Sequence, residues 1–429
     1  MVSKAIDPFT IRWRVLPILT IIENAACFDG FGDQLAEGTH VAVEGDRIRE
    51  VSDRPITGAA DRRIDATGLT LMPGMIDAHV HVYAAELNLT RVSRRPWTYL
   101  AHYAATFLRH MLRCGYTTVR DTGGGDYGLA AALRDGLLEG PTLYYGNQLL
   151  SQLGGHADWR PPEEDDPACT LCGCGAIDQK MAIIADGVDG VIRAAREQLR
   201  RGAHHIKIVA SGGVASPSDA LEAIQYSPAE ITAIVEECAR HGKYVAAHCH
   251  PDAAVRRAVE LGVRSIEHAT LIEPDTARMV AKSDAYLVPT MAVIFALDQD
   301  GAALGLPPAS VAKLRQITRR AVASLQIMKD AGCRIGFGTD LLGPHHDRQG
   351  IEFGIRREVF SNAEILRQVT SVNAALLCAE GELGCVKPEA RADLLLVNGN
   401  PLRNLDLLAA NGANLAMVMH GGVPKRLTV

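Results

Sequence analysis

The sequence predicts an α/β protein that combines a (β/α)8 barrel with a small β-sandwich domain. Between residues 75 and 385, eight apolar strand-like runs alternate with helical stretches, which is the count of a (β/α)8 barrel. Residues 1–74 and 386–429 show short strands joined by turns instead, and the first segment is too short to cover both faces of a sheet alone. We therefore expect a barrel, residues 75–385, inserted into a β-domain, residues 1–74 and 386–429, that both termini build.

The strands of this terminal domain are expected in runs that turn signals separate. These runs are ILTIIENAACFDG (18–30), HVAVEGDRIREVS (40–52), RRIDATGLTLMPG (62–74), ADLLLV (392–397) and LAMVMHGGVPKRLTV (415–429). Residues 44–46, Glu-Gly-Asp, are a tight-turn sequence between two alternating runs. The apolar run 15–22 follows Arg12 and Arg14 and loosely resembles a signal peptide. It contains a proline and leads into a hairpin pattern, so a strand is favoured.

The barrel strands and helices are expected to alternate along the middle of the chain. The strand candidates are Gly74–Val82, Tyr116–Thr122, Leu143–Leu150, His205–Ser211, Tyr244–His250, Ser265–Thr270, Tyr286–Val293 and Arg334–Thr339. The helix candidates are Trp97–Arg113, Asp186–Arg201, Pro228–His241, Asp252–Leu261, Glu273–Lys282 and Pro308–Ala331. Ser227, Pro228 and Glu230 together are typical of a helix start. A doubly wound sheet is the alternative, but the glycines at 123–125 lack the GxGxxG spacing of a phosphate-binding turn.

The composition excludes several classes of protein. The chain has 429 residues, of which 47% are hydrophobic and 22% charged, and its formal net charge is −6, an ordinary globular balance. It has no basic tract longer than three residues, so we expect no nucleic-acid partner. No apolar stretch reaches the length of a membrane-spanning helix, so no membrane partner is expected either. Ten cysteines do not form a dense framework, which favours reduced thiols and a cytoplasmic location.

Three cysteines lie close together in the sequence CTLCGC. Cys169, Cys172 and Cys174 could hold a soft metal ion, but no second pair with zinc-ribbon spacing follows. A loop near the barrel entrance is the favoured interpretation, and in a secreted protein these thiols could pair instead.

Six polar side chains lie at or near the ends of the predicted strands. His79 and His81 end the first strand, and residues two apart in a strand point to the same side. The others are Lys207 in HHIKIVASGG, His248 in VAAHCH, His268 in SIEHAT and Asp340 in GFGTD. Each alone could be a core histidine, a snorkelling lysine or a turn aspartate. Barrel enzymes place their chemistry at this end of the strands, so the whole set predicts a metal site.

With PGMIDAHVH (73–81), these strands resemble the amidohydrolase superfamily of metal-dependent hydrolases over nearly the whole chain. The resemblance implies two divalent metal ions, and Zn²⁺ suits the ligands. His79, His81 and Asp340 would bind one ion, while His248 and His268 would bind the other. Lys207, carboxylated by CO2 to an anionic carbamate, would bridge both. A metal-bridging hydroxide would attack the carbonyl, with Asp340 as the catalytic residue that passes the proton to the leaving nitrogen.

Other histidines lie near these positions. His250 follows His248 by two residues and could support it or rival it as a ligand, and the family pattern favours His248. His345 and His346 follow Asp340 and could line the mouth of the site, but we assign them no role.

Four local sequences resemble one branch of the superfamily. They are SQLGGHAD (151–158), KIVASGGVASPSD (207–219), QYSPAEITAIVEECARHGKYVAAHCH (225–250) and SIEHATLI (265–272). This branch contains prolidase-like (Xaa-Pro) dipeptidases and amidohydrolases that cleave N-acyl amino acids such as ochratoxin A. It implies carboxypeptidase-like or dipeptidase-like hydrolysis of an amide whose amine side carries a free carboxylate. His156 and Tyr226 occupy motif positions, the former suited to the carboxylate and the latter to the carbonyl oxygen. The arginines at 91, 94 and 95 are expected on a solvated face.

Three alternatives stay open. A cyclic-amide (lactam) hydrolase would keep the same metal site. A mononuclear deaminase would not need the lysine at 207, and a catalytically dead metal-binding scaffold would not need all six ligand positions filled. The resemblance also implies a homo-oligomer, for which an octamer is one form, and a small-molecule amide or dipeptide as the partner.

Overall fold

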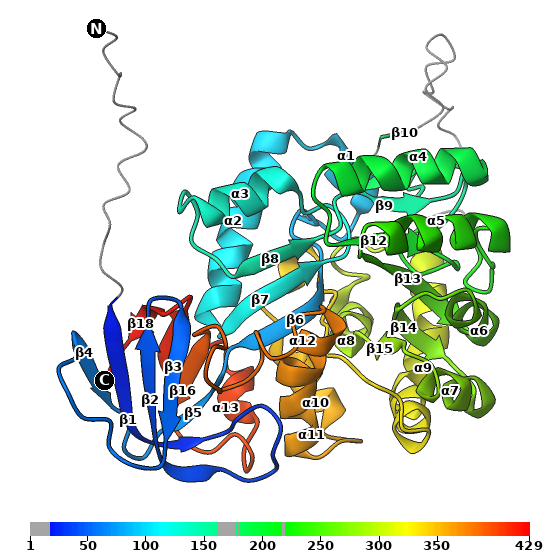
Figure 1. Ribbon diagram of the computed structural model, residues 1–429. Helices are drawn as coiled ribbons and strands as arrows, with labels where there is room; N and C mark the ends of the chain where they lie inside the picture. The colour runs from blue at the N-terminus through cyan, green and yellow to red at the C-terminus, as the bar shows by residue number, and fades with distance from the viewer. Residues whose placement is uncertain (1–17, 161–176, 179, 217–218) are drawn as a thin grey trace, which may run out of the picture.

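The computed structural model describes residues 18–160, 177–178, 180–216 and 219–429 (Figure 1). The cysteine cluster of Cys169, Cys172 and Cys174 lies outside these residues, as do Arg12, Arg14 and the start of the apolar run at 15–22. In the described part of the chain, no helix combines the length and the apolar character needed to cross a membrane.

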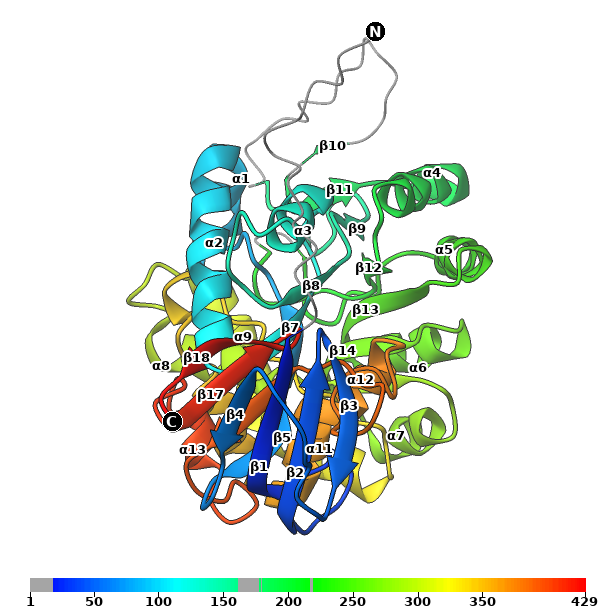
Figure 2. The same cartoon turned by 60° about the vertical axis from the view of Figure 1, so that its left-hand side comes forward.

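Strands from both ends of the chain form one eight-stranded sheet. Figure 2 shows these strands, blue and red, side by side. They are β1 (Leu19–Cys27), β2 (Ala36–Glu44), β3 (Arg47–Ser52), β4 (Arg62–Asp65), β5 (Thr70–Pro73), β16 (Leu394–Val397), β17 (Leu415–His420) and β18 (Val423–Leu427). The two ends of the chain meet where β16 pairs with β5, antiparallel, and the sheet buries a core of its own around Ile22, Leu71 and Leu396. The expectation that both termini build one sheet is therefore met.

The middle of the chain contributes two further, mostly parallel sheets, so the fold is mixed α/β. One sheet contains β6 (Met75–Val80), β7 (Tyr116–Asp121) and β8 (Thr142–Tyr145). The other contains β9 (Leu149–Ser151), β10 (Ile177–Asp178), β11 (Ala182–Ile184), β12 (His205–Val209), β13 (Tyr244–Pro251), β14 (Ser265–Leu271) and β15 (Tyr286–Val288). In the described residues the pairing does not close into one continuous barrel. The predicted third strand is divided between both sheets, because the backbone turns at Asn147, whose φ is 57°.

The predicted eighth strand, Arg334–Thr339, is not a regular strand. Its backbone forms one isolated bridge, from Ile335 to Leu287, but it also hydrogen bonds to the other side. Ala78 N donates to Phe337 O, and Asp340 N donates to His79 O, at 2.9 and 2.8 Å. A side chain at Gly338 would place its Cβ 2.7 Å from the Cβ of His79, so glycine is needed for this approach. The segment therefore holds Asp340 beside the first strand although its own pairing is irregular.

The predicted seventh strand, Tyr286–Val293, is too long. It ends at Val288, and helix α8 (Met291–Asp300) begins after Thr290, whose φ of 50° breaks the extended backbone. Because α8 is apolar on most of its surface, its sequence carries no helical period to distinguish it from a buried strand.

The six predicted helices are present with bounds that differ by at most one residue at either end. They are α2 (Trp97–Arg113), α4 (Gly187–Arg200), α5 (Pro228–Arg240), α6 (Asp252–Glu260), α7 (Pro274–Ala281) and α9 (Pro308–Asp330). Ser227 and Glu230 form the predicted helix start as a capping box, each side chain bonded to the other's backbone N–H. The additional helical segments are α1 (Leu89–Arg94), α3 (Tyr127–Arg134), η1 (Gly343–His345), α10 (Gly350–Arg356), α11 (Asn362–Arg367), η2 (Gln368–Val372), α12 (Asn373–Leu376) and α13 (Asp406–Ala409).

Candidate metal centre and active site

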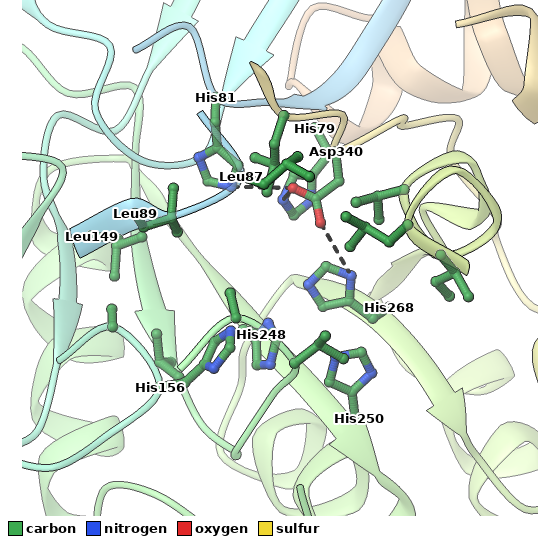
Figure 3. A pocket seen from close by; sticks show the side chains of 18 of the residues that line it. His79, His81, Leu87, Leu89, Leu149, His156, His248, His250, His268 and Asp340 are labelled. Carbon is green, nitrogen blue, oxygen red and sulfur yellow. Dashed lines mark ion pairs between the residues drawn. The ribbon is translucent and has the colours of Figure 1, made fainter. Parts of the chain in front are cut away.

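A cavity opens where the parallel strands end. Its polar wall contains His79, His81, His156, Lys207, His248, His250, His268 and Asp340, and the remainder is almost entirely apolar. Figure 3 shows most of these side chains directed toward one opening.

The first donor cluster consists of His79, His81 and Asp340, whose potential ligand atoms lie within 4.8 Å of one another. The Nε2 atoms of His79 and His81 are 3.4 and 3.3 Å from Asp340 Oδ1. Their Nδ1 atoms face away and bond to Glu267 at 2.6 Å and to the carbonyl of Gly123 at 2.9 Å. Each ring is therefore fixed with one nitrogen toward the carboxylate.

The second donor cluster consists of His248, His250 and His268, again within 4.8 Å. His268 Nδ1 bonds to Thr290 Oγ1 at 2.7 Å, and His250 Nδ1 to Thr270 Oγ1 at 2.8 Å. The two clusters adjoin, because His268 Nδ1 is 3.9 Å from Asp340 Oδ2. The geometry includes His250 alongside the two predicted ligands.

Burial keeps His79, His248, His250 and His268 neutral near pH 7, whereas at His81 the Asp340 carboxylate outweighs burial and raises the pKa. Burial lowers the pKa of His79 to about 4 and that of His250 to about 3, and it lowers the pKa of His248 and His268 well below the ordinary value. A neutral imidazole with one nitrogen engaged keeps a lone pair on the other nitrogen, which is the form that binds metal ions. The residues present therefore fit a pair of divalent metal ions.

Two charged members of the wall differ from the histidines. Burial lowers the pKa of Lys207 to about 8, although Glu267 and Asp340 oppose this shift. Burial would raise the pKa of Asp340, but His79, His81 and Lys207 outweigh it and hold that pKa below its ordinary value. Asp340 is therefore ionised, while part of the Lys207 population is a neutral amine near pH 7.

An amidohydrolase family model matches residues 70–424 of the chain. The chain belongs to the amidohydrolase family. A crystal structure described as an amidohydrolase is 45% identical, with a TM-score of 0.93, and the match covers 95% of this chain and 99% of that one. A prolidase crystallised with N-methylphosphonate-L-proline is 40% identical, with a TM-score of 0.91 and coverage of 95% and 100%. Ochratoxinase from Aspergillus niger is 31% identical over 349 residues, which are 78% of this chain and 71% of the relative.

These matches confirm the predicted family and its prolidase-like branch, and this amidohydrolase is a hydrolase that acts on amide bonds. Members of the family generally use divalent metal ions, in agreement with the two histidine clusters.

The two predicted substrate-binding residues lie in different surroundings. His156 is on the cavity wall, where its ring stacks on His248 at 4.3 Å and its Nδ1 is 3.0 Å from Ser216 Oγ. Tyr226 is not among the lining residues, and its buried hydroxyl donates to the carbonyl of Ala185 at 3.1 Å. The geometry therefore brings His156, and not Tyr226, to the cavity of this amidohydrolase.

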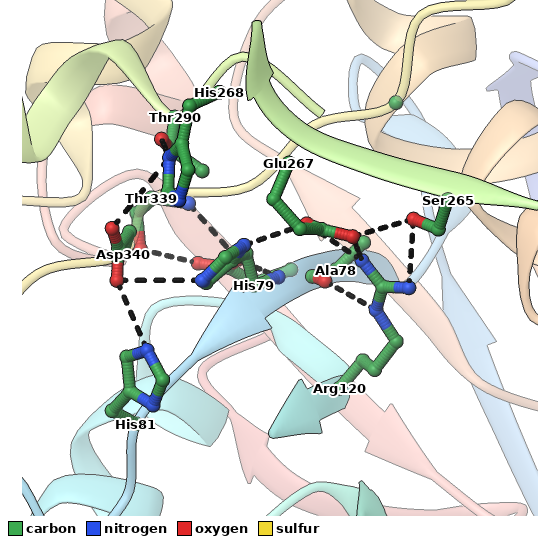
Figure 4. A network of polar contacts seen from close by, with 12 residues as sticks. Ala78, His79, His81, Arg120, Ser265, Glu267, His268, Thr290, Thr339 and Asp340 are labelled. Atoms are coloured by element: carbon green, nitrogen blue, oxygen red, sulfur yellow. Dashed lines mark hydrogen bonds and ion pairs between the residues drawn. The ribbon is translucent and has the colours of Figure 1, made fainter. Parts of the chain in front are cut away.

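Sequence reasoning missed two charged residues behind the first cluster (Figure 4). Glu267 accepts the bond from His79 Nδ1, and Arg120 donates to both of its carboxylate oxygens at 2.9 and 3.0 Å. Arg120 also donates to the carbonyl of Ala78 and to Ser265 Oγ. Both charged side chains are fully buried. The available signal was a charged residue inside each of two predicted strands, Arg120 in TTVRD and Glu267 in SIEHAT, where burial requires a partner.

Backbone strain gathers at the site of this amidohydrolase. His268, Thr290 and Asp340 have φ values of 73°, 50° and 55°, a region that non-glycine residues seldom adopt. For Thr290, a β-branched residue, this conformation is a true outlier, and its hydroxyl is the partner of His268 Nδ1. The strain places donor groups where regular strand geometry would not put them.

Proposed function

We propose that this amidohydrolase cleaves the amide bond of dipeptides or N-acyl amino acids whose amine side carries a free carboxylate. The observation that carries the proposal is one cavity with two adjoining donor clusters on one side and apolar side chains on the other. The relatives support it, because one was crystallised with an N-phosphonate derivative of proline and another is named ochratoxinase.

We assign the metal ligands as the sequence predicts. His79, His81 and Asp340 would hold one ion, and His248 and His268 the other, with Zn²⁺ as the proposed metal and His250 as a further candidate donor. Bound divalent metals supply a Lewis acid for the carbonyl and lower the pKa of water. Lys207 would react as its neutral amine with CO2, releasing a proton and giving the bridging carbamate. Its lowered pKa supports that step.

The chain's own residues would orient the substrate and move the proton. Asp340 is ionised, so its carboxylate can accept a proton from the attacking water and deliver it to the leaving nitrogen as the C–N bond breaks. Nε2 of His156 can donate to the substrate carboxylate in the tautomer that carries the ring proton there, with Nδ1 accepting from Ser216 Oγ. We give Tyr226 no direct contact in this arrangement, since its hydroxyl is engaged by Ala185.

The proposal extends to the architecture. We assign residues 75–385 to a (β/α)8 catalytic barrel and residues 1–74 with 386–429 to a β-sandwich domain. The two mostly parallel sheets and the irregular segment that bonds to both β15 and β6 support the first assignment. The shared terminal sheet supports the second. A homo-oligomer remains part of the prediction.

A substrate panel tests the function directly. Protein supplied with Zn²⁺ and bicarbonate would be assayed for amine release from Xaa-Pro dipeptides, other dipeptides, N-acyl phenylalanines including ochratoxin A, and unsubstituted lactams. We expect turnover of substrates with a carboxy-terminal proline or phenylalanine. Ring opening of lactams alone would favour the cyclic-amide alternative, and no turnover by metal-loaded protein would favour a dead scaffold.

Replacing His156 by Ala should weaken binding of the substrate carboxylate. We expect KM to rise roughly 10- to 100-fold for N-acyl phenylalanine, the effect of losing one hydrogen bond to a charged group. For the corresponding phenylalaninamide, which lacks the carboxylate, the KM of His156→Ala should change little. The control variant His241→Ala, at an exposed site, should keep the wild-type KM for both substrates. Equal losses for acid and amide would argue against carboxylate recognition by His156.

A further inference from the structure

One wall of the cavity consists entirely of aliphatic side chains from α8, α9 and the turn between them. We call it the acyl wall, and it contains Val293, Ile294, Leu297, Leu306, Leu314 and Ile317. All six are buried, and no charged side chain of α8 or α9 is among the residues that line the cavity.

The acyl wall belongs to the main hydrophobic core, and on α8 it lies on a different face from a second, smaller packing cluster. On α8, Ala292 and Ala296 pack against Leu341, one helical turn apart. Val293 and Leu297 have the same spacing and line the cavity instead. The helix is therefore apolar on two faces: one packs against Leu341, and the other packs into the main core and lines the cavity.

The positions of α9 that line the cavity are aliphatic as well. This helix carries the charged residues Lys313, Arg315 and Arg319, yet its cavity-lining positions, Leu314 and Ile317, are both aliphatic. Lys313 does not line the cavity, and its ammonium donates to the carbonyls of Gly213 and Ser216 and to Asp219. An apolar surface is thus maintained next to a row of cations.

The acyl wall is tied to the segment that carries Asp340. Asp300, the last residue of α8, bonds to His345 Nε2 at 2.6 Å and accepts from Arg348 at 2.7 Å. Both partners lie in the segment that follows Asp340. Figure 3 shows His156 across the cavity from Asp340, so a substrate carboxylate at His156 would leave the acyl group to the rest of the cavity.

We infer that the acyl wall binds the acyl group of the substrate and selects N-acyl amino acids with long aliphatic or aromatic acyl chains over dipeptides with a free amino terminus. This inference rests on the proposed function. The free amino group of a dipeptide is a cation, and burying it without a partner is unfavourable. Among the described residues that line the cavity, Asp340 is the single carboxylate, and it already faces His79 and His81.

Two comparisons with metal-loaded wild-type protein test the inference. The first is 4-methylpentanoyl-phenylalanine against Leu-Phe, which differ only by the amino group. We expect kcat/KM to favour the N-acyl compound on the order of 10-fold or more. The second is a series of N-acyl phenylalanines from acetyl to octanoyl, for which kcat/KM should rise about fourfold per methylene until the wall is covered.

A variant pair locates the effect. Leu306→Ala should flatten the dependence on acyl length, whereas Leu304→Ala, an exposed leucine in the same turn outside the cavity lining, should leave it unchanged. A cooperative thermal unfolding transition would show that both variants fold. If Leu306→Ala does not fold, the two comparisons with wild-type protein still test the inference. A flat length dependence with preference for Leu-Phe would overturn this inference and leave the proposed function intact. Failure to cleave any amide would overturn both.

Discussion

Replacing Glu267 by Gln should destabilise the protein and also weaken metal binding at the first cluster. Glu267 accepts from Arg120 and from His79, and neither Glu267 nor Arg120 is exposed to solvent. Burial alone would raise the pKa of Glu267, but Arg120, Lys207 and His79 hold it far below its ordinary value. The carboxylate is therefore ionised, and the substitution leaves the Arg120 cation buried without its anion.

Two effects of different size are expected from this change. Breaking a buried ion pair by removing one partner lowers the free energy of unfolding by about 3–5 kcal/mol. Losing the anionic acceptor of His79 Nδ1 should lower metal affinity roughly 10- to 100-fold, as is typical for groups that orient a metal ligand. Chemical denaturation followed by circular dichroism measures the first effect, and competition with a metal-chelating dye measures the second.

A double-mutant cycle separates orientation from stability. Arg120→Met with Glu267→Gln leaves no unpaired charge, so it should be less destabilised than the sum of the single variants. Its metal affinity should stay low, because His79 still lacks the carboxylate. The matched control is Glu352→Gln, which breaks the equally buried pair of Glu352 and Arg356. We expect a comparable loss of stability there with normal metal affinity, and wild-type affinity in folded Glu267→Gln would show that the pair only supports the fold.

The parts of the fold that the sequence predicts are those with a local signal. Helix α5 has a capping box and helix α2 has an apolar period, and the predicted bounds of the two helices follow from these features. The third and seventh strands were predicted too long because a single left-handed residue, Asn147 or Thr290, interrupts the extended backbone between two apolar stretches. No residue type forces that conformation, so the break depends on tertiary contacts.

In the candidate site, too, the residues with a local sequence signal could be predicted and the others could not. His79 and His81 could be predicted because strand geometry fixes their relative direction, and Asp340 because it follows a strand-like run. Arg120 and Glu267 meet although 147 positions separate them in sequence. Their pairing is set by the order of β7 and β14 around the cavity, which no local pattern encodes. His250 could not be separated from His248 because both lie on one face of one strand.

Replacing Asp340 by Asn should abolish most turnover while leaving the fold intact. Asn has the same shape, and like Asp it tolerates the left-handed conformation at φ 55°. The amide cannot take the proton that the ionised carboxylate accepts, and general acid–base contributions of this kind are about 10²–10⁴-fold in rate. We therefore expect kcat to fall by roughly that factor. The melting temperature should change little, because the backbone bond to His79 O remains.

The matched control for Asp340→Asn is Asp347→Asn, the same chemical change at an exposed position in the segment that follows. It should leave kcat and KM unchanged. The metal content of both variants should be measured by elemental analysis. The amide oxygen of the introduced asparagine can still coordinate a cation, but loss of a ligand would lower the number of metal ions per chain. A loss of kcat with metal retained assigns Asp340 to proton transfer. Loss of metal together with activity would assign it to metal binding alone, and wild-type kcat would exclude the proposed mechanism, because no other carboxylate lines the described cavity to take its place.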